Sequence, residues 1–578
     1  MASDERALAT WLAGRDDREL ADILVARGVS PSAPWKDFFD AADALLEKTS
    51  IERALVHLTR GELTALAAQL DGRPLPASET AGPPARLALT GVDGAPWHPV
   101  ATALRRIRDE RPDAFEAVTD ETAPEPASED ETLAAAERTF ATVGSLADVL
   151  VAATHAPLAR ITSGGVSAAD RRKLLDAGAL GESDELDDIV GAAAAAGLLT
   201  TSGRDWDVSD AGARWLEAST AERWRIVVTG FRDALPSGLR TPRGGYVPVT
   251  AWTTRYPLDP EWAPRSDRLA RIARQWGLLT PEAHEPAWAT PLRDGGDPQT
   301  DELTRHLPAE IDRVYLQADL TAIAPGPLAP RLELRLRRLA ARESRAQAST
   351  YRFTAESLTA GLTEGETAAS IREFLTGLSL TGLPQPLGYL IDSTAARHGL
   401  IRVRTDAATR RTMVESGDPA LLDAVSVDQG LRALGLVADG DALTTGVSQE
   451  TVAWALSDAR YPVVSVGDDG RPAALRNRAR PRTDRAEPAP EPHASLIRVL
   501  RGSHDDNAEG AWLEREIVQA VRNRSVIDVV VRMPDGAERT FTLEATGFGG
   551  GRLRGRDQSS DVERTLPLSH VVTVRSVA

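Results

Sequence analysis

The stretch from Tyr315 to Arg404 constrains the fold more than any other, because it is both strongly patterned and strongly positive. Its residues predict a strand, a Pro-Gly turn, an arginine-rich helix, two short helices, a proline-bracketed helix and a closing strand. Thr354 is expected to cap the first short helix, and Gly399 to end the bracketed helix. This order of elements predicts a mixed α and β module.

Between residues 328 and 352, seven arginines accompany only two glutamates, which gives a net charge of +5 in a chain of net charge −18. Such a local reversal of sign favours a surface for an anion, whereas the alternative is a solvated helix face of an arginine-rich protein. The neighbouring leucines at 332, 336 and 339 are expected to face inward. The candidate anion-binding residues here are Arg335, Arg338, Arg342 and Arg345, expected on one helical stripe, with Arg402 and Arg404 on one face of the closing strand.

Composition narrows the class of protein. A chain of 578 residues predicts roughly three to five domains. It contains no cysteine, which excludes disulfides, cysteine-bound zinc, iron–sulfur clusters and thiol nucleophiles. The N-terminus has no apolar signal region, and no apolar run approaches the ~20 residues of a membrane span. We therefore expect a soluble cytoplasmic protein, without membrane contact. Because 64 of its 67 basic residues are arginine, arginine content alone is weak support for nucleic-acid binding.

The chain divides into six predicted ranges. Ser50 is expected to cap a helix pair in the first range, with a break at Gly61. Ten acids and one arginine between 109 and 131 predict a flexible linker. The ranges are 1–108, a helical domain; 109–132, the acidic linker; 133–300, a winged-helix region; 301–470, the module around the opening stretch; 471–493, an Arg/Pro linker; and 494–578, a small barrel domain.

The winged-helix prediction comes from a repeat. Gly-Leu-Leu-Thr at 197–200 and again at 277–280 ends a helix and precedes an expected tryptophan-bearing strand, which predicts one winged helix at 145–235 and a second at 235–300. A winged helix can read DNA with the helix before the wing. Here that helix would begin near 182 with five carboxylates, which phosphate repels. A protein-docking or architectural role is therefore favoured.

The last range predicts one amphipathic helix followed by strands, with a hairpin turn at 534–536 and a small SH3-like barrel. The arginines at 552, 554 and 556 alternate along one strand and so share one face. Their repeat of about 6.6 Å suits a row of phosphates, although a solvated edge strand is the alternative. Arg552, Arg554 and Arg556 complete the candidate DNA-binding residues.

Motifs of catalysis are missing from the sequence. No Gly-Lys pair exists, although a Walker-type phosphate loop requires that lysine. No G-x-S-x-G elbow occurs, and the nine histidines are scattered. We therefore expect no catalytic residue, no metal site and no cofactor, and predict that the protein is not an enzyme.

Residues 311–405 resemble the N-terminal domain of XPB-type DNA-repair helicases, in the form found in actinobacterial helicase-associated proteins. The resemblance rests on VYLQADLTAIAPGPLAP, on RLAARESRAQASTYRFTAESLTAGL and on IREFLTGLSLTGLPQPLGYLIDSTAARHGLIRV. It implies contact with DNA and with a helicase or repair partner. Residues 495–578 resemble a WYL-type domain, although VIDVVV stands where the Trp-Tyr-Leu signature is expected.

Three functions are consistent with these features. The first is a DNA-binding accessory protein of helicase or repair machinery that contacts the backbone. The second is a WYL-type transcriptional regulator, against which the acidic helix near 182 argues. The third is a protein-interaction scaffold for a helicase, with the arginines facing an acidic partner.

Overall fold

The computed structural model describes residues 2–71, 82–116, 122–180, 185–344, 348–467, 472–473, 491–505, 508–533 and 536–576. The chain forms two compact units, and each combines helices with small sheets. The expected mixed multidomain class is confirmed at this level. Unit 1 comprises residues 1–122, 248–267 and 486–578, and unit 2 comprises 123–247 and 268–485. Among the described residues, no helix combines the length and apolar character needed to cross a membrane.

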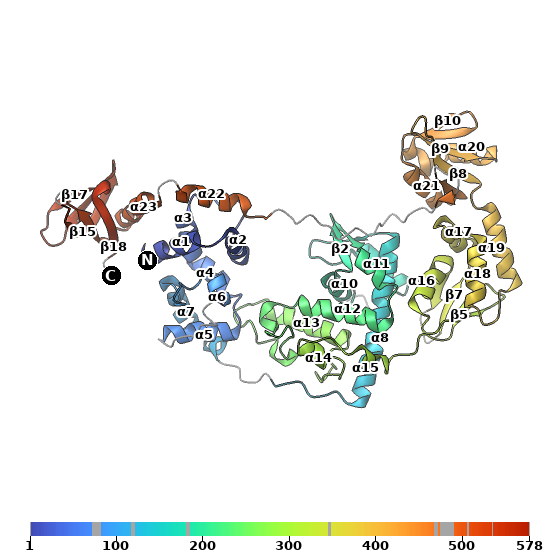
Figure 1. The fold of residues 1–578 in the computed structure, drawn as a ribbon, viewed down its shortest axis with the longest axis horizontal. Coiled ribbons are helices and arrows are strands. Elements are labelled where there is room, and N and C mark those ends of the chain that lie inside the picture. Colours follow the sequence, from blue (N-terminus) through green and yellow to red (C-terminus); the bar gives the residue numbers. More distant parts are fainter. Residues whose placement is uncertain are drawn as a thin grey trace. The chain divides into compact units, whose positions relative to one another are not determined.

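Unit 1 begins with packed short helices (Figure 1). Ser50 does not cap the fourth helix, which already begins at Lys48 after Glu47. The next helix starts after Thr59, whose hydroxyl and Glu62 form a capping box, so Gly61 lies inside a helix rather than at a break. The helices are α1 (Ala2–Ala13), α2 (Asp17–Ala26), α3 (Phe38–Leu46), α4 (Lys48–Leu55), α5 (Arg60–Leu70), α6 (Pro83–Arg86), α7 (His98–Glu110) and the 3-10 helix η1 (Pro112–Phe115).

The C-terminal part of unit 1 contains two helices, α22 (Ala494–Asp505) and α23 (Ala508–Asn523), and one sheet. Leu496, Ile497 and Leu500 of α22 join the core of the N-terminal helices. The sequence predicted a separate domain at 494–578 and did not predict this packing. The packing joins residues more than 400 positions apart, which local patterns do not report.

The sheet of unit 1 is antiparallel and packs one face on α23. Its order is β17-β16-β15-β14-β18, and the described strands leave β17 and β18 as its two edges. The closed barrel expected from the sequence is therefore not found among them. Of the predicted turn, 534–535 lie outside the described residues, but Arg532 pairs with Glu538 across the hairpin. The strands are β14 (Val526–Arg532), β15 (Glu538–Gly549), β16 (Arg552–Asp557), β17 (Glu563–Pro567) and β18 (Val571–Ser576), with the 3-10 helix η6 (Leu568–His570).

Unit 2 begins with a long helix, α8 (Glu129–His155), capped by Ser128 and Glu131. A three-stranded antiparallel sheet in the order β1-β3-β2 follows. The acidic segment expected to be a linker is thus partly helical, while 117–121 lie outside the described residues. The elements are β1 (Leu158–Ala159), α9 (Ala168–Asp176), α10 (Leu186–Ala195), β2 (Leu199–Ser202), β3 (Asp205–Val208), α11 (Asp210–Trp215) and α12 (Thr220–Asp233).

The second Gly-Leu-Leu-Thr repeat, at 277–280, is not followed by the expected tryptophan-bearing strand. Trp288 is fully buried in an irregular segment, where its indole N–H donates to the Gly277 carbonyl at 2.8 Å. The strand predicted there is wrong, because the tryptophan fills the core instead of pairing with a neighbouring strand. The elements of residues 237–304 are the 3-10 helices η3 (Ser237–Leu239) and η4 (Val249–Ala251), then α13 (Trp262–Gln275), α14 (Thr290–Arg293) and α15 (Thr300–Thr304).

The module around the opening stretch contains the predicted helices and closing strand in the predicted order, but the paired strands of residues 341–344 and 349–352 were not predicted. Thr354 caps α17 (Ala355–Thr363), and Gly399, with a φ of 81°, follows the end of α19 (Gln385–Arg397). Both predictions are confirmed. The other elements are β4 (Tyr315–Leu316), β5 (Thr321–Ala324), α16 (Pro330–Leu339), β6 (Ala341–Ser344), β7 (Ser349–Arg352) and α18 (Ala368–Leu378), and the sheet order is β4-β5-β7-β6.

A third sheet completes the described part of unit 2, in the order β10-β11-β9-β8-β12-β13. Its pairs are antiparallel except for β12 with β8, which run parallel. Of the predicted Arg/Pro linker, 471 and 474–490 lie outside the described residues. The elements are β8 (Ile401–Thr405), β9 (Thr412–Ser416), α20 (Pro419–Val427), the 3-10 helix η5 (Gln429–Leu434), β10 (Val437–Asp439), β11 (Ala442–Thr445), α21 (Gln449–Asp458), β12 (Val463–Val466) and β13 (Pro472–Ala473).

Candidate functional site

The arginine-rich helix α16 begins at Pro330 and ends at Leu339. Leu336 and Leu339 are fully buried in the module core, and Leu332 packs against it, so the predicted inward leucine stripe is confirmed. The helix is shorter than the sequence suggests, because the chain turns into β6 and pairs with β7.

The prediction that four arginines share one stripe of a helix is therefore wrong. Arg335 and Arg338 lie on α16, but Arg342 lies on β6. Arg345 lies outside the described residues. A ten-residue helix presents only two of the four arginines, and strand pairing sets the direction of the third.

Arg335 already has an internal partner. Its Nε and Nη2 donate to the two carboxylate oxygens of Glu366 at 2.8 and 2.9 Å. Its guanidinium also lies 4.4 Å from the ring centre of Phe374. The hydrogen bonds that Arg335 donates to Glu366 raise the pKa of Arg335. The paired geometry holds this side chain in place and offsets its charge.

Arg331 and Arg338 are the more exposed arginines of α16. Their side chains are 77% and 56% exposed, and their nearest carboxylates, on Glu217 and Glu364, lie 3.7 Å away. Ion pairs of this length at a surface contribute little, so solvent phosphate can compete for these guanidinium groups.

Arg402 and Arg404 lie on one face of β8, as predicted from their alternation. Arg402 is exposed and stands opposite Glu415 in the strand register. Arg404 donates to Glu415 at 2.7 Å, and this hydrogen bond raises its pKa. The Glu415 carboxylate reduces the positive charge of this face.

Arg552, Arg554 and Arg556 are all exposed on one face of β16, while Leu553, Gly555 and Asp557 between them are buried. The expected alternation is confirmed. Arg556 pairs with Asp561 at 2.6 Å, and that hydrogen bond raises its pKa. For Arg552 and Arg554, no ion pair joins them to another described residue.

Near these two arginines, strand β15 carries glycines. Gly549 stands opposite Arg552, and Gly547 stands opposite Arg554. Because neither glycine has a side chain, the surface beside both guanidinium groups is low and open to a partner.

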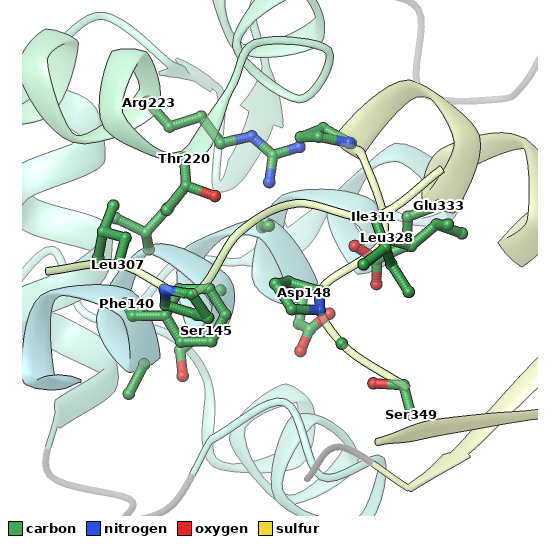
Figure 2. A pocket seen from close by; sticks show the side chains of 18 of the residues that line it. Phe140, Ser145, Asp148, Thr220, Arg223, Leu307, Ile311, Leu328, Glu333 and Ser349 are labelled. Carbon is green, nitrogen blue, oxygen red and sulfur yellow. The ribbon is translucent and has the colours of Figure 1, made fainter. Parts of the chain in front are cut away.

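A cavity of about 1140 Å³ within unit 2 borders the other end of the arginine-rich segment (Figure 2). Its walls come from α8, the start of α12, residues 306–311 and 325–330, α16 and β7. Figure 2 shows Asp148 of α8 and Glu333 of α16 lining this space together with Arg223 of α12.

Asp148 binds two arginines at the edge of this cavity. It is 3% exposed and accepts from Arg337 at 2.6 Å and from Arg342. Arg342 also donates to Glu333 at 3.2 Å, and Tyr351 donates to the same Glu333 oxygen at 3.3 Å. Burial opposes the charge of Arg342, but Asp148 and Glu333 outweigh it and raise its pKa.

Arg223 supplies a third buried guanidinium beside the cavity. It donates to the main-chain carbonyls of Trp215, at 3.1 Å, and Leu216, and it lies over the Trp215 ring. Burial lowers its pKa to about 10, although nearby carboxylates, including Glu333 and Asp148, oppose the shift. At neutral pH this side chain stays charged.

Sequence reasoning missed Asp148, although a signal exists. It is the one ionisable residue within the apolar run LADVLVAA of α8, and a carboxylate on a buried helix face requires a partner. The partners, Arg337 and Arg342, lie 189 and 194 residues away, so the sequence alone does not identify them.

The acidic helix expected to repel DNA is partly neutralised. Asp188 of α10 accepts from Arg268 and Arg271, each at 2.7 Å, and Asp187 pairs with Arg171 at 2.8 Å. Residues 181–184, which carry two of the five carboxylates, lie outside the described residues. The repulsion argument therefore weakens for this helix. Among the described residues, no group of three or more potential metal ligands exists.

Residues 314–439 match the family model described as the helicase conserved C-terminal domain. The match starts just before β4 and ends with β10, so it includes α16 and its arginines. No curated protein matches the chain. The match supports a helicase-related protein, while the XPB-type and WYL-type resemblances stay predictions.

This match corrects the prediction that the protein is not an enzyme. Helicase-family proteins are usually enzymes, and the prediction rested on short motifs that the sequence lacks, the Walker-type lysine among them. A missing short motif is a weaker argument than a match over a whole domain.

Proposed function

We propose that this helicase-related protein binds the DNA backbone through exposed arginines. The match over 314–439 carries the proposal, because it includes the arginine-rich helix. The arginines best placed for phosphate are Arg331 and Arg338 on α16 and Arg552 and Arg554 on β16, since they are exposed and weakly paired. Arginine contacts to phosphate position a protein on DNA without reading its sequence.

The predicted winged helix at 145–235 has an architectural role in this proposal. In this proposal its parts would be helix α8, strand β1, helices α9 and α10 and the β2–β3 hairpin. Such a module would hold the helicase-related segment and dock a helicase or repair partner.

A scaffold for an acidic protein partner is the second candidate. The acidic side chains of such a partner would pair with the exposed guanidinium groups of Arg331 and Arg338, whose own carboxylate partners lie 3.7 Å away. A partner recovered from nuclease-treated extract, together with no DNA affinity of the purified chain, would support this candidate instead.

A quadruple variant tests DNA binding. Replacing Arg331, Arg338, Arg552 and Arg554 by alanine should weaken DNA binding at low salt and flatten its salt dependence. Since each phosphate contact contributes about 0.9 to the slope of log affinity against log salt, the slope should fall by roughly 3 to 4. Fluorescence anisotropy with duplex, forked and single-stranded DNA at several salt concentrations measures both effects.

A matched control removes the same charge elsewhere. The exposed arginines Arg18, Arg53, Arg86 and Arg105 of unit 1, replaced together by alanine, should leave the slope within about 1 of the unmodified chain. Equal binding by the two quadruple variants would refute the proposed role of these four arginines. Nucleotide hydrolysis with and without DNA is measured on the same samples, because helicase-family proteins are usually enzymes.

A further inference from the structure

We propose that Asp148 is an intramolecular competitor for DNA phosphate, which holds Arg337 and Arg342 in an inhibited state. The inference rests on the proposed DNA binding and concerns its regulation. In this state the two arginines face a carboxylate from another part of unit 2, and these two side chains can contact DNA only when Asp148 releases them.

One carboxylate accepts from two guanidinium groups, with Arg337 on oxygen Oδ1 and Arg342 on oxygen Oδ2. Two guanidinium groups that converge on two oxygens of one anion also match the geometry of a phosphate group. The carboxylate therefore occupies the place that a phosphate would take.

Glu333 faces Arg342 as well, so two carboxylates balance the two arginines in this cluster. Arg223 is the further cation beside it. While Asp148 is in place, the cluster attracts phosphate only weakly; once it leaves, Arg337 and Arg342 keep only Glu333.

The side chains of Arg337 and Arg342 are 19% and 12% exposed, so they offer little to solvent. Both nevertheless line the cavity of about 1140 Å³, and residues 306–311 and 325–330 form another part of its wall. A separation of α16 and β6 from α8 would open this existing space toward the arginines.

The same unit contains a matched ion-pair cluster without these properties. Asp188, also almost fully buried, accepts from Arg268 and Arg271. Those arginines are already 49% and 59% exposed. Removing the Asp188 charge therefore changes the net charge as much as removing the Asp148 charge, but uncovers no buried arginine.

The test compares the full-length variants Asp148→Asn and Asp188→Asn. Asp148→Asn should bind duplex DNA at least tenfold more tightly than the unmodified chain at low salt. Its slope of log affinity against log salt should steepen by about 2, because two arginines gain phosphate contacts of about 0.9 each. Asp188→Asn should stay within about twofold of the unmodified chain. The triple variant with Asp148→Asn, Arg337→Gln and Arg342→Gln should lose the gain.

Two results would overturn the inference: equal affinities of the two single variants, or a gain that persists in the triple variant. If Asp148→Asn does not fold, as judged by circular dichroism, Glu333→Gln decides, because it removes the other carboxylate while keeping Asp148. It should raise affinity about threefold, and an unchanged affinity would contradict the inference. If the unmodified chain binds DNA and Asp148→Asn binds it no more tightly, only the inhibition is refuted. If neither the unmodified chain nor any variant binds DNA, the proposed function is refuted.

Discussion

Replacing Trp224 by alanine is expected to lower the free energy of unfolding of unit 2 by about 4 kcal/mol. Trp224 lies on α12, is fully buried, and donates its indole N–H to the Trp276 carbonyl at 2.8 Å. The substitution leaves a large cavity and a buried carbonyl without its donor, and the two costs add.

Hydrogen exchange of the α12 amides measures this loss within the full chain. Protection should fall about a thousandfold, since each 1.4 kcal/mol corresponds to a factor of ten. The control is Tyr389→Ala, which truncates an aromatic residue of unit 2 that is 75% exposed. That variant should change stability by less than about 0.5 kcal/mol. Near-native protection of α12 in the Trp224 variant would show that the core repacks.

The second large effect is a pH dependence of unit 1. Glu516 of α23 is buried, and burial raises its pKa to about 7, with the charge of Glu5 acting in the same direction and Arg6 opposing it. Glu5 is buried too; burial raises its pKa, and the charge of Asp43 adds to this. The Arg6 guanidinium lies 4.0 Å from Glu516, too far for a hydrogen bond.

The sign follows from the raised pKa. Because the folded state holds the Glu516 proton more tightly than the unfolded state, this stabilisation is complete below the ordinary glutamate pKa. It is lost as the pH rises from about 4.5 to about 7. A shift of this size corresponds to on the order of 3 kcal/mol. Glu516→Gln should therefore stabilise unit 1 at pH 8 and reduce the pH dependence in this range.

The control for this prediction lies on the same helix. Glu514 is exposed two residues earlier, so Glu514→Gln should leave the pH dependence unchanged. Hydrogen exchange of the α1 and α23 amides at pH 5 and pH 8 measures the effect. If Glu516→Gln and Glu514→Gln respond alike, the buried carboxylate is not the source.

The sequence predicted best where an element depends on its own residues. Thr354 as a helix cap, the buried Leu336 and Leu339, and the alternation of Arg552 and Arg554 are all local patterns. Side-chain spacing and capping act within a few residues, so they can be read without the fold. The prediction at Ser50 failed because the helix begins two residues earlier, after Glu47. The prediction at Trp288 failed because burial of the indole decided the local conformation.

The sequence by itself therefore determined the order of the helices and the closing strand around 315–404 and the positions of most arginines along them. The tertiary structure decided which arginines remain available. Asp148, 189 residues from Arg337, neutralises two of them, while Arg331, Arg338, Arg552 and Arg554 stay exposed. The reason is physical: an ion pair forms wherever packing brings opposite charges together, and packing between distant segments is not encoded in local spacing.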